Sequence, residues 1–183
     1  MRICIDPGHS GSFEPGACAG GYKEADVVMA ISLLLAEILQ RNQHEVVLTR
    51  TRSIFTDELQ FRCDTASDFN ADIFLSLHCN AAENPRAMGT EVFHYPGSVE
   101  GGKLAGCIQK EIVASMGTVD RGVKFANFMV LRETNCPAVL IELAFISNEG
   151  DRSSLTDLLL RRGFAVAVAR GVEAYSSSIV AKI

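Results

Sequence analysis

Residues 2–17 read RICIDPGHSGSFEPGA, and this stretch decides how the rest of the chain is arranged. The apolar pattern predicts a strand over Ile3–Asp6. The strand ends at Pro7-Gly8, because proline donates no ladder hydrogen bond and glycine adopts backbone angles that other residues avoid. His9 therefore follows the carboxyl end of a strand. Ligands of open α/β sheets bind beyond that end, so His9 is a candidate functional residue.

Apolar runs and helical periodicities alternate along the rest of the chain. They predict strands at Glu45–Thr49, Asp72–Leu77, Thr90–Tyr95, Phe128–Leu131 and Ala138–Leu143, and helices at 24–40, 56–70, 99–116 and within 151–176. Residues 7–23 are expected to form a loop, and the 56–70 helix is expected to turn Leu59 and Phe61 inward. Strands that alternate with helices predict a single α/β domain, with a mostly parallel, twisted sheet of about six strands and helices on both faces. We expect this domain to span residues 1–176 and residues 177–183 to be a tail or the start of a linker.

Composition excludes several classes of protein. The formal net charge is −5, whereas a nucleic-acid interface requires a basic face. No apolar stretch is long enough to cross a bilayer. The six cysteines are widely spaced without a C-x-x-C pair, so we expect free thiols. The first residues lack a charged segment followed by an apolar one. We therefore expect a protein made in the cytoplasm without a signal peptide, or a domain excised from a longer secreted chain.

Four polar residues end, interrupt or follow the predicted apolar strands: His9, Glu24, His78 and Glu142. Each has an ordinary structural interpretation as well, because a histidine can cap a turn or sit satisfied in a core and Glu24 suits a helix N-terminus. Glu142 interrupts the apolar run AVLIEL, and a buried carboxylate must be paired, ligated or shifted in pKa. Parallel strand ends share one edge, so the four side chains can converge. Two imidazoles and a carboxylate form a set that holds catalytic zinc, and the second carboxylate can handle the proton.

The chain resembles the zinc-dependent N-acetylmuramoyl-L-alanine amidases of the amidase-3 type over nearly all of its length. Seven segments carry the resemblance in order: Asp6–His9 with Glu14–Ala17, Glu24, Leu48–Arg50, Ser76–Ala81, Gly89–Phe93, Val130–Thr134, and Pro137–Glu142 with Phe145–Asn148. It implies that His9, Glu24 and His78 bind one zinc ion and that Glu142 is the catalytic carboxylate. Asn80 and Arg132 would contact substrate, although Arg132 is equally suited to pairing with a structural carboxylate.

The resemblance also implies the substrate, the amide between N-acetylmuramic acid and L-alanine in peptidoglycan. Some relatives carry an inhibitory helix after the second histidine, and the short segment between His78 and Gly89 predicts an open site without one. Two alternatives remain open: a zinc hydrolase of another amide or peptide bond on this scaffold, and a non-catalytic cell-wall binding module. The expected setting is the cell wall, reached as a phage or prophage endolysin, a sporulation lysin or part of an autolysin, with a separate wall-binding domain as a possible partner.

Overall fold

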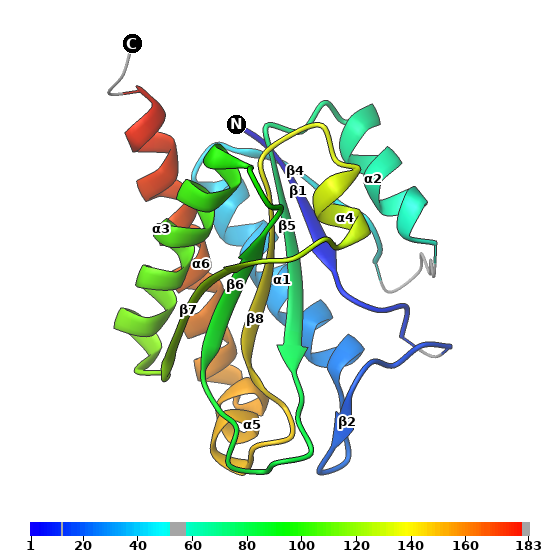
Figure 1. Cartoon of the computed structure of the whole chain (residues 1–183), viewed down its shortest axis with the longest axis vertical. Coiled ribbons are helices and arrows are strands. Elements are labelled where there is room, and N and C mark those ends of the chain that lie inside the picture. The colour runs from blue at the N-terminus through cyan, green and yellow to red at the C-terminus, as the bar shows by residue number, and fades with distance from the viewer. Residues whose placement is uncertain (12, 52–57, 181–183) are drawn as a thin grey trace.

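The structure is a computed structural model that describes residues 1–11, 13–51 and 58–180 of the chain (Figure 1). Its elements in chain order are β1 (Arg2–Pro7), β2 (Cys18–Ala19), β3 (Tyr22–Lys23), α1 (Glu24–Arg41), β4 (Glu45–Leu48), α2 (Leu59–Asp68), β5 (Ile73–Asn80), β6 (Thr90–His94), α3 (Val99–Met116), β7 (Asp120–Phe125), α4 (Met129–Arg132), β8 (Ala138–Phe145), α5 (Glu149–Thr156) and α6 (Leu158–Val180).

A six-stranded sheet with the order β4-β1-β5-β8-β6-β7 forms the centre of the molecule. Every neighbouring pair is parallel except β6 and β8, which run antiparallel. The predicted α/β class with a mostly parallel sheet is confirmed. Because β1, β5 and β8 are adjacent and parallel, their carboxyl ends lie at one edge of the sheet. The register places His78 of β5 beside Glu142 of β8 at this edge.

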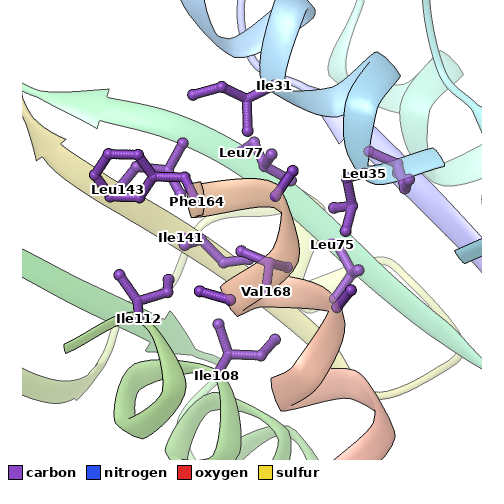
Figure 2. Close-up of a cluster of buried hydrophobic side chains, with 14 of the residues drawn as sticks. Ile31, Leu35, Leu75, Leu77, Ile108, Ile112, Ile141, Leu143, Phe164 and Val168 are labelled. Atoms are coloured by element: carbon purple, nitrogen blue, oxygen red, sulfur yellow. The ribbon is translucent and has the colours of Figure 1, made fainter. Parts of the chain in front are cut away.

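The larger hydrophobic core lies between the sheet and the helices α1, α3 and α6. Figure 2 shows side chains from all three helices meeting those of β5 and β8, among them Ile31, Leu35, Leu75, Leu77, Ile108, Ile112, Ile141, Leu143, Phe164 and Val168. The strand residues in this set alternate in sequence, because successive side chains of a strand point to opposite faces. The intervening residues, including His78 and Glu142, therefore point to the other face.

That other face carries a smaller core beneath α2 and α4. Cys63 and Ala66 of α2 and Val130 of α4 pack there against Phe74 of β5 and Leu140 of β8. In Figure 1 these two short helices lie over the β1, β5 and β8 part of the sheet, and among the described residues no helix covers β6 and β7 on the same side. The smaller core thus leaves the sheet partly open next to the edge that carries His78 and Glu142.

Two local predictions were wrong. Residues 128–131 do not form a strand, since Met129–Arg132 is the short helix α4, and the real strand β7 was missed at Asp120–Phe125. All strand neighbours of β8 are already supplied by β5 and β6, so the apolar segment 128–131 has no free interior edge to join. β7 lies at the sheet's outer edge, where exposed polar residues are tolerated, and it therefore lacks a strong apolar pattern.

The structure differs from the sequence-based expectations at three further places. Leu59 and Phe61 of α2 do not point inward, since they are 48% and 43% exposed. Part of the expected loop 7–23 forms the small antiparallel pair β2–β3. Helix α6 extends to Val180, so residues 177–180 of the expected tail are helical. The proposed helix start at residues 56 and 57, and residues 181–183 of the tail, lie outside the described residues.

All six cysteines lie in the described part of the chain and are free thiols, as expected. The short segment 81–89 between β5 and β6 contains turns and no helix. None of the helices in the described ranges is both long enough and apolar enough to cross a membrane.

Candidate metal and catalytic site

The turn after β1 brings His9 to the edge of the sheet in an uncommon backbone conformation. His9 has a φ angle of +65°, in the left-handed region that non-glycine residues rarely occupy. A Cβ atom on Gly8 would lie 2.4 Å from the ring of His78. A Cβ atom on Gly16, whose φ angle is +69°, would lie 2.5 Å from the His9 ring and 2.7 Å from a Glu24 oxygen. The glycines therefore let the backbone approach the three polar side chains.

Asp6, a buried carboxylate in β1, anchors the start of this turn. Asp6 is 1% exposed. Its oxygens accept hydrogen bonds from Thr49 Oγ1 at 2.6 Å, Arg62 Nη1 at 2.5 Å and Ser76 Oγ at 2.7 Å. Since Ser76 is two residues before His78, the same network ties the strand that carries the second histidine to the turn that carries the first.

Two buried arginines hold the backbone of the turn. Arg50 donates to the carbonyl oxygens of Pro7 and Gly8 at 2.8 and 2.7 Å. Arg62 donates to Pro7 and to the carbonyl of His9 at 2.9 and 2.7 Å. Burial, together with the charge of Arg62, lowers the pKa of Arg50 to about 10, and the guanidinium stays protonated at neutral pH. A residue in such a backbone conformation costs of order 1–3 kcal/mol of stability. The hydrogen bonds from the two arginines offset this cost and fix the turn.

The side chains of His9, Glu24 and His78 meet in one cluster, with one possible ligand atom from each within 4.8 Å of the others. His9 Nε2 lies 2.9 Å from Glu24 Oε2, and His78 Nδ1 lies 3.1 Å from Glu24 Oε1. The other nitrogen of His9 is 2.7 Å from Glu14 Oε2. A carboxylate on the far nitrogen orients a histidine whose near nitrogen binds a metal. The residues thus form a group that can hold a metal ion.

The cluster keeps Glu24 ionised although the side chain is buried. Burial alone would raise the pKa of Glu24, but hydrogen bonds with His78 and His9 outweigh it and hold the pKa well below its usual range. The backbone N–H groups of Cys79 and Ala17 also donate to its two oxygens, each at 2.9 Å. Burial alone would likewise lower the pKa of His9, but Glu24 and Glu14 raise it. A cation would be favoured at this preorganised negative charge.

Glu142 lies beside this cluster and has a different environment. It is paired in register with His78 across β5 and β8. Among the described residues no donor reaches its buried Oε2 atom. Burial raises the pKa of Glu142 to about 7, with the histidines lowering it and the carboxylates of Glu24 and Glu91 raising it further. A carboxyl group with a pKa near neutrality can both accept and donate a proton at working pH.

A cavity of about 360 Å³ opens over Glu142 and the histidines, between the sheet and the helices α2 and α4. Its described lining residues combine the polar site with an apolar wall: Asp6, His9, Glu14, Leu59, Arg62, Ser76, His78, Phe128, Met129, Val130, Leu140 and Glu142. Concave sites with an apolar wall and a few convergent polar groups are typical of small-molecule and substrate sites.

The two expected substrate contacts lie outside this group. Of the residues that the structure describes, neither Asn80 nor Arg132 lines the cavity. Asn80 donates from Nδ2 to Glu91 Oε1 at 2.7 Å. Arg132 ends α4 and donates to Glu133 Oε1 and Asn127 Oδ1 at 2.7 and 2.6 Å. The pairing of Arg132 with a carboxylate is the alternative that the sequence left open.

Sequence reasoning gave no role to Glu14, Arg62 or Glu91. Glu14 and Glu91 occur in the segments quoted for the resemblance, but only the structure shows that Glu14 holds His9 and that Glu91 lies opposite Glu142. Arg62 lies in α2, which the sequence suggested would be buried through Leu59 and Phe61 instead. One signal was available, since Asp6 ends an apolar strand and a buried aspartate requires a buried cation or several donors.

Comparison with known proteins gives a consistent result. The model of the family Amidase_3, described as N-acetylmuramoyl-L-alanine amidase, matches residues 3–174. The amidase LytC of Bacillus subtilis is 36% identical over 176 residues, which are 94% of this chain and 35% of LytC. The sporulation-specific N-acetylmuramoyl-L-alanine amidase of the same organism is 35% identical over 177 residues, covering 94% of this chain and 67% of that protein.

Among solved structures, the N-acetylmuramoyl-L-alanine amidase AmiC2 of Nostoc punctiforme superposes with a TM-score of 0.91. It is 34% identical, and the match covers 97% of both chains. The chain therefore corresponds to an entire amidase structure in one case and to about a third of a longer relative in another.

Proposed function

Because the chain belongs to the Amidase_3 family of N-acetylmuramoyl-L-alanine amidases, we propose that it hydrolyses the amide between N-acetylmuramic acid and L-alanine in peptidoglycan. The observation that carries the proposal is the convergence of His9, Glu24 and His78 on one point with Glu142 beside them. This arrangement lies at the carboxyl edge of the sheet and faces a cavity large enough for part of a substrate.

The metal in this proposal is one zinc ion, held by His9, Glu24 and His78. The donor set fits, because two imidazoles and a carboxylate are the ligands of several catalytic zinc sites, and Glu14 is placed to orient His9 from behind. When bound, zinc supplies a Lewis acid that polarises a carbonyl group and lowers the pKa of a water molecule. The preorganised charge of Glu24 supports the binding of a divalent cation.

Glu142 is the proposed catalytic carboxylate. Glu142 lines the cavity beside His78 in the strand register, and its Oε2 atom has no donor among the described residues, so the carboxyl group is not committed to another partner through that oxygen. The Glu142 carboxylate takes a proton from the attacking water and returns it to the leaving nitrogen of L-alanine. The raised pKa of Glu142 suits a group that must do both.

Asn80 and Arg132 remain proposed substrate contacts. Asn80 follows His78 on the same strand, and Arg132 ends the helix whose Met129 and Val130 line the cavity. In this proposal residues 1–176 are the catalytic domain, which acts on the cell wall as a lysin or as part of a secreted autolysin. A separate wall-binding domain is the proposed partner, since the acidic chain itself has no general attraction for an anionic surface.

The test is mass spectrometry of purified peptidoglycan after digestion by the zinc-loaded protein. The proposal expects free stem peptides that begin with L-alanine and glycan strands with free lactyl groups. Products cut within the stem peptide would instead identify a zinc hydrolase of another bond. Binding to the wall without any cleavage would identify a non-catalytic module and refute the proposed function.

A further inference from the structure

A second polar cluster lies next to Glu142, and of its residues the proposed function uses only Asn80. Its centre is Glu91 of β6, which is 5% exposed. Glu91 Oε2 accepts hydrogen bonds from Arg121 Nε at 2.7 Å and Lys124 Nζ at 2.5 Å, both from β7. Glu91 Oε1 accepts from Asn80 at 2.7 Å. One buried carboxylate therefore holds two cations and an amide in fixed positions.

The sheet places this cluster one strand away from the reacting centre. β6 runs antiparallel to β8, and the register pairs Glu91 directly with Glu142. Directly opposed residues of antiparallel strands point to the same face with Cβ atoms about 5 Å apart. Glu91 and its two cations consequently lie on the face of the sheet that also carries Glu142.

Arg121 and Lys124 keep hydrogen-bond donors that face outward. Their side chains are 33% and 41% exposed. Arginine has five N–H donors and lysine three; Glu91 accepts one from each, and the Met88 carbonyl accepts one from Arg121 Nη1 at 3.4 Å. The Arg121 guanidinium lies 4.8 Å from the centre of the Phe145 ring, and Lys124 Nζ lies 5.9 Å from that of Phe93. The two cations are therefore held in place without being buried.

The charge of this cluster differs from that of the whole chain. Two cations and one carboxylate leave a local charge of about +1, whereas the chain has a formal net charge of −5. Among the described residues, no helix covers this half of the sheet on the Glu142 side (Figure 1). Arg121 and Lys124 stay partly exposed and their partner Glu91 is paired in register with Glu142, so an extended anionic ligand that reaches Glu142 can also meet the two cations.

We propose that Arg121 and Lys124 bind a carboxylate of the stem peptide on the leaving side of the scissile amide, and that Glu91 is the positioning residue that holds both cations. The inference rests on the proposed function, because Glu142 then meets the nitrogen of L-alanine. Adjacent strands lie about 4.8 Å apart, and an extended peptide advances about 3.4 Å per residue. The carboxyl group of the second stem residue therefore lies within reach of the cations.

The experiment compares two muramoyl peptides that differ only in the second stem residue, D-glutamate with a free α-carboxylate or D-isoglutamine with a carboxamide. We expect the zinc-loaded wild type to show a KM about 10-fold lower for the free carboxylate, with similar kcat. Arg121→Gln and Lys124→Gln should each reduce this preference at least about 3-fold, and the double variant should abolish it. Arg41→Gln removes the same charge at the exposed end of α1 and should change nothing.

A merely structural role for the two cations gives a different result. A loss of stability would change kcat or KM equally for both substrates. An unchanged ratio of the two KM values in both variants would therefore overturn the proposal. Lys124→Gln is the more secure variant, because Arg121 and Asn80 still satisfy Glu91. A wild type that does not distinguish the two substrates would overturn it as well.

Calorimetry separates this inference from the proposed function. The released tripeptides, with either D-glutamate or D-isoglutamine in second position, are titrated into the zinc-loaded protein without any turnover. The same preference in binding, reduced at least about 3-fold in Lys124→Gln and lost in the double variant, supports the subsite even if the protein cleaves neither muramoyl peptide and the proposed function fails. Equal binding of both tripeptides to the wild type refutes the subsite even if the amide is cleaved as proposed.

Discussion

Two carboxylates of this site are adjusted in opposite directions by their surroundings. Glu24 receives hydrogen bonds from two histidines and two backbone N–H groups, and its pKa is held low. The Oε2 atom of Glu142 is buried without a donor among the described residues, and burial of the side chain raises its pKa to about 7. Carboxylates separated in this way commonly have separate tasks. The residue pattern alone did not say which carboxylate binds metal and which handles the proton. The family resemblance implied that Glu24 is the ligand and Glu142 the catalytic carboxylate, and the two environments support this division.

Substitution of the two kinds of residue should separate metal binding from turnover. Glu142→Ala should bind zinc normally but lose nearly all turnover, because the proton acceptor is gone. His9→Ala and His78→Ala should lose the metal, because two ligands are too few to hold it. Metal content after dialysis and release of lactyl ends measure the two properties. Wild-type turnover in Glu142→Ala would show that another group handles the proton.

Glu142 should also make the stability of the metal-free protein depend on pH. Its pKa is raised from 4.5 to about 7 on folding, so the folded state holds a proton that the unfolded state releases between these values. Stability from this group is present below pH 4.5 and is lost as the pH rises through 7. In Glu142→Gln this loss is absent, so the variant should be more stable than wild type at pH 8, by up to about 3 kcal/mol.

Urea unfolding in the presence of a chelator at pH 5 and pH 8 measures this difference. The comparison with the variant isolates the contribution of Glu142, because the two proteins differ only at residue 142. Adding zinc should reduce the difference at pH 8, because a nearby cation lowers the pKa of a carboxylate. An equal stability of both proteins at pH 8 without metal would show that burial does not raise the pKa of Glu142.

Gly16 tests the close approach of the backbone to the metal ligands. Gly16→Ala would place a methyl group 2.5 Å from the His9 ring and 2.7 Å from a Glu24 oxygen, so the ligands must move. We expect metal affinity to fall about 10- to 100-fold, as for loss of groups that orient ligands. Gly21→Ala is the matched control, since Gly21 also has a positive φ angle but open space around it. Similar zinc affinity of both variants in a competition titration would contradict the expectation.

Which segments form strands or helices, and which side chains they bury, depends in three places on their position relative to the sheet, not on the local apolar pattern. The segment MVLR at 129–132 is apolar enough for a strand but forms α4 over the sheet, because the interior edges are occupied. β7, with the sequence DRGVKF, has one partner strand and keeps its polar residues exposed. Helix α2 is held by buried Arg62, Cys63 and Ala66 rather than by its large apolar residues. These outcomes depend on neighbours that the local sequence does not contain.

The packing of α3 against α6 provides a prediction at this scale. A Cβ atom on Gly171 of α6 would lie 2.6 Å from Ile108 Cα of α3, so Gly171→Ala must separate the helices. We expect a loss of about 1–2 kcal/mol in the free energy of unfolding. Gly106→Ala on α3 adds the same methyl group to open space and should instead stabilise by about 0.5–1 kcal/mol. Chemical denaturation of both variants measures the contrast, and a stabilised Gly171→Ala would refute the close contact.

At the scale of the whole molecule, the proposed metal connects elements that are distant in sequence. His9 follows β1, Glu24 begins α1 and His78 lies in β5. An ion that binds this set binds the folded state, because the unfolded chain does not bring the three side chains together. Metal binding is therefore coupled to stability.

Zinc should raise the melting temperature of the protein, and a chelator should reverse the effect. At a free zinc concentration about 100 times Kd the stabilisation is about 2.7 kcal/mol, which for a chain of this size is a shift of roughly 5–10 °C. His78→Ala should melt at the same temperature with and without zinc. Calorimetry or fluorescence melting measures the shift, and an equal shift in His78→Ala would place the metal elsewhere.

Sequence patterns alone predicted the α/β class, the strand that ends just before His9, and His9, Glu24, His78 and Glu142 as candidate site residues. Apolar periodicity and chain-breaking residues are local properties, and they state where a strand stops and which side chain follows. The contacts that complete the site appear only in the folded molecule: Arg50 and Arg62 fix the turn, and Glu14 holds His9. Glu91 lies opposite Glu142 and pairs with Arg121 and Lys124. Strand order and register set those neighbours, and both arise from packing between segments far apart in the chain.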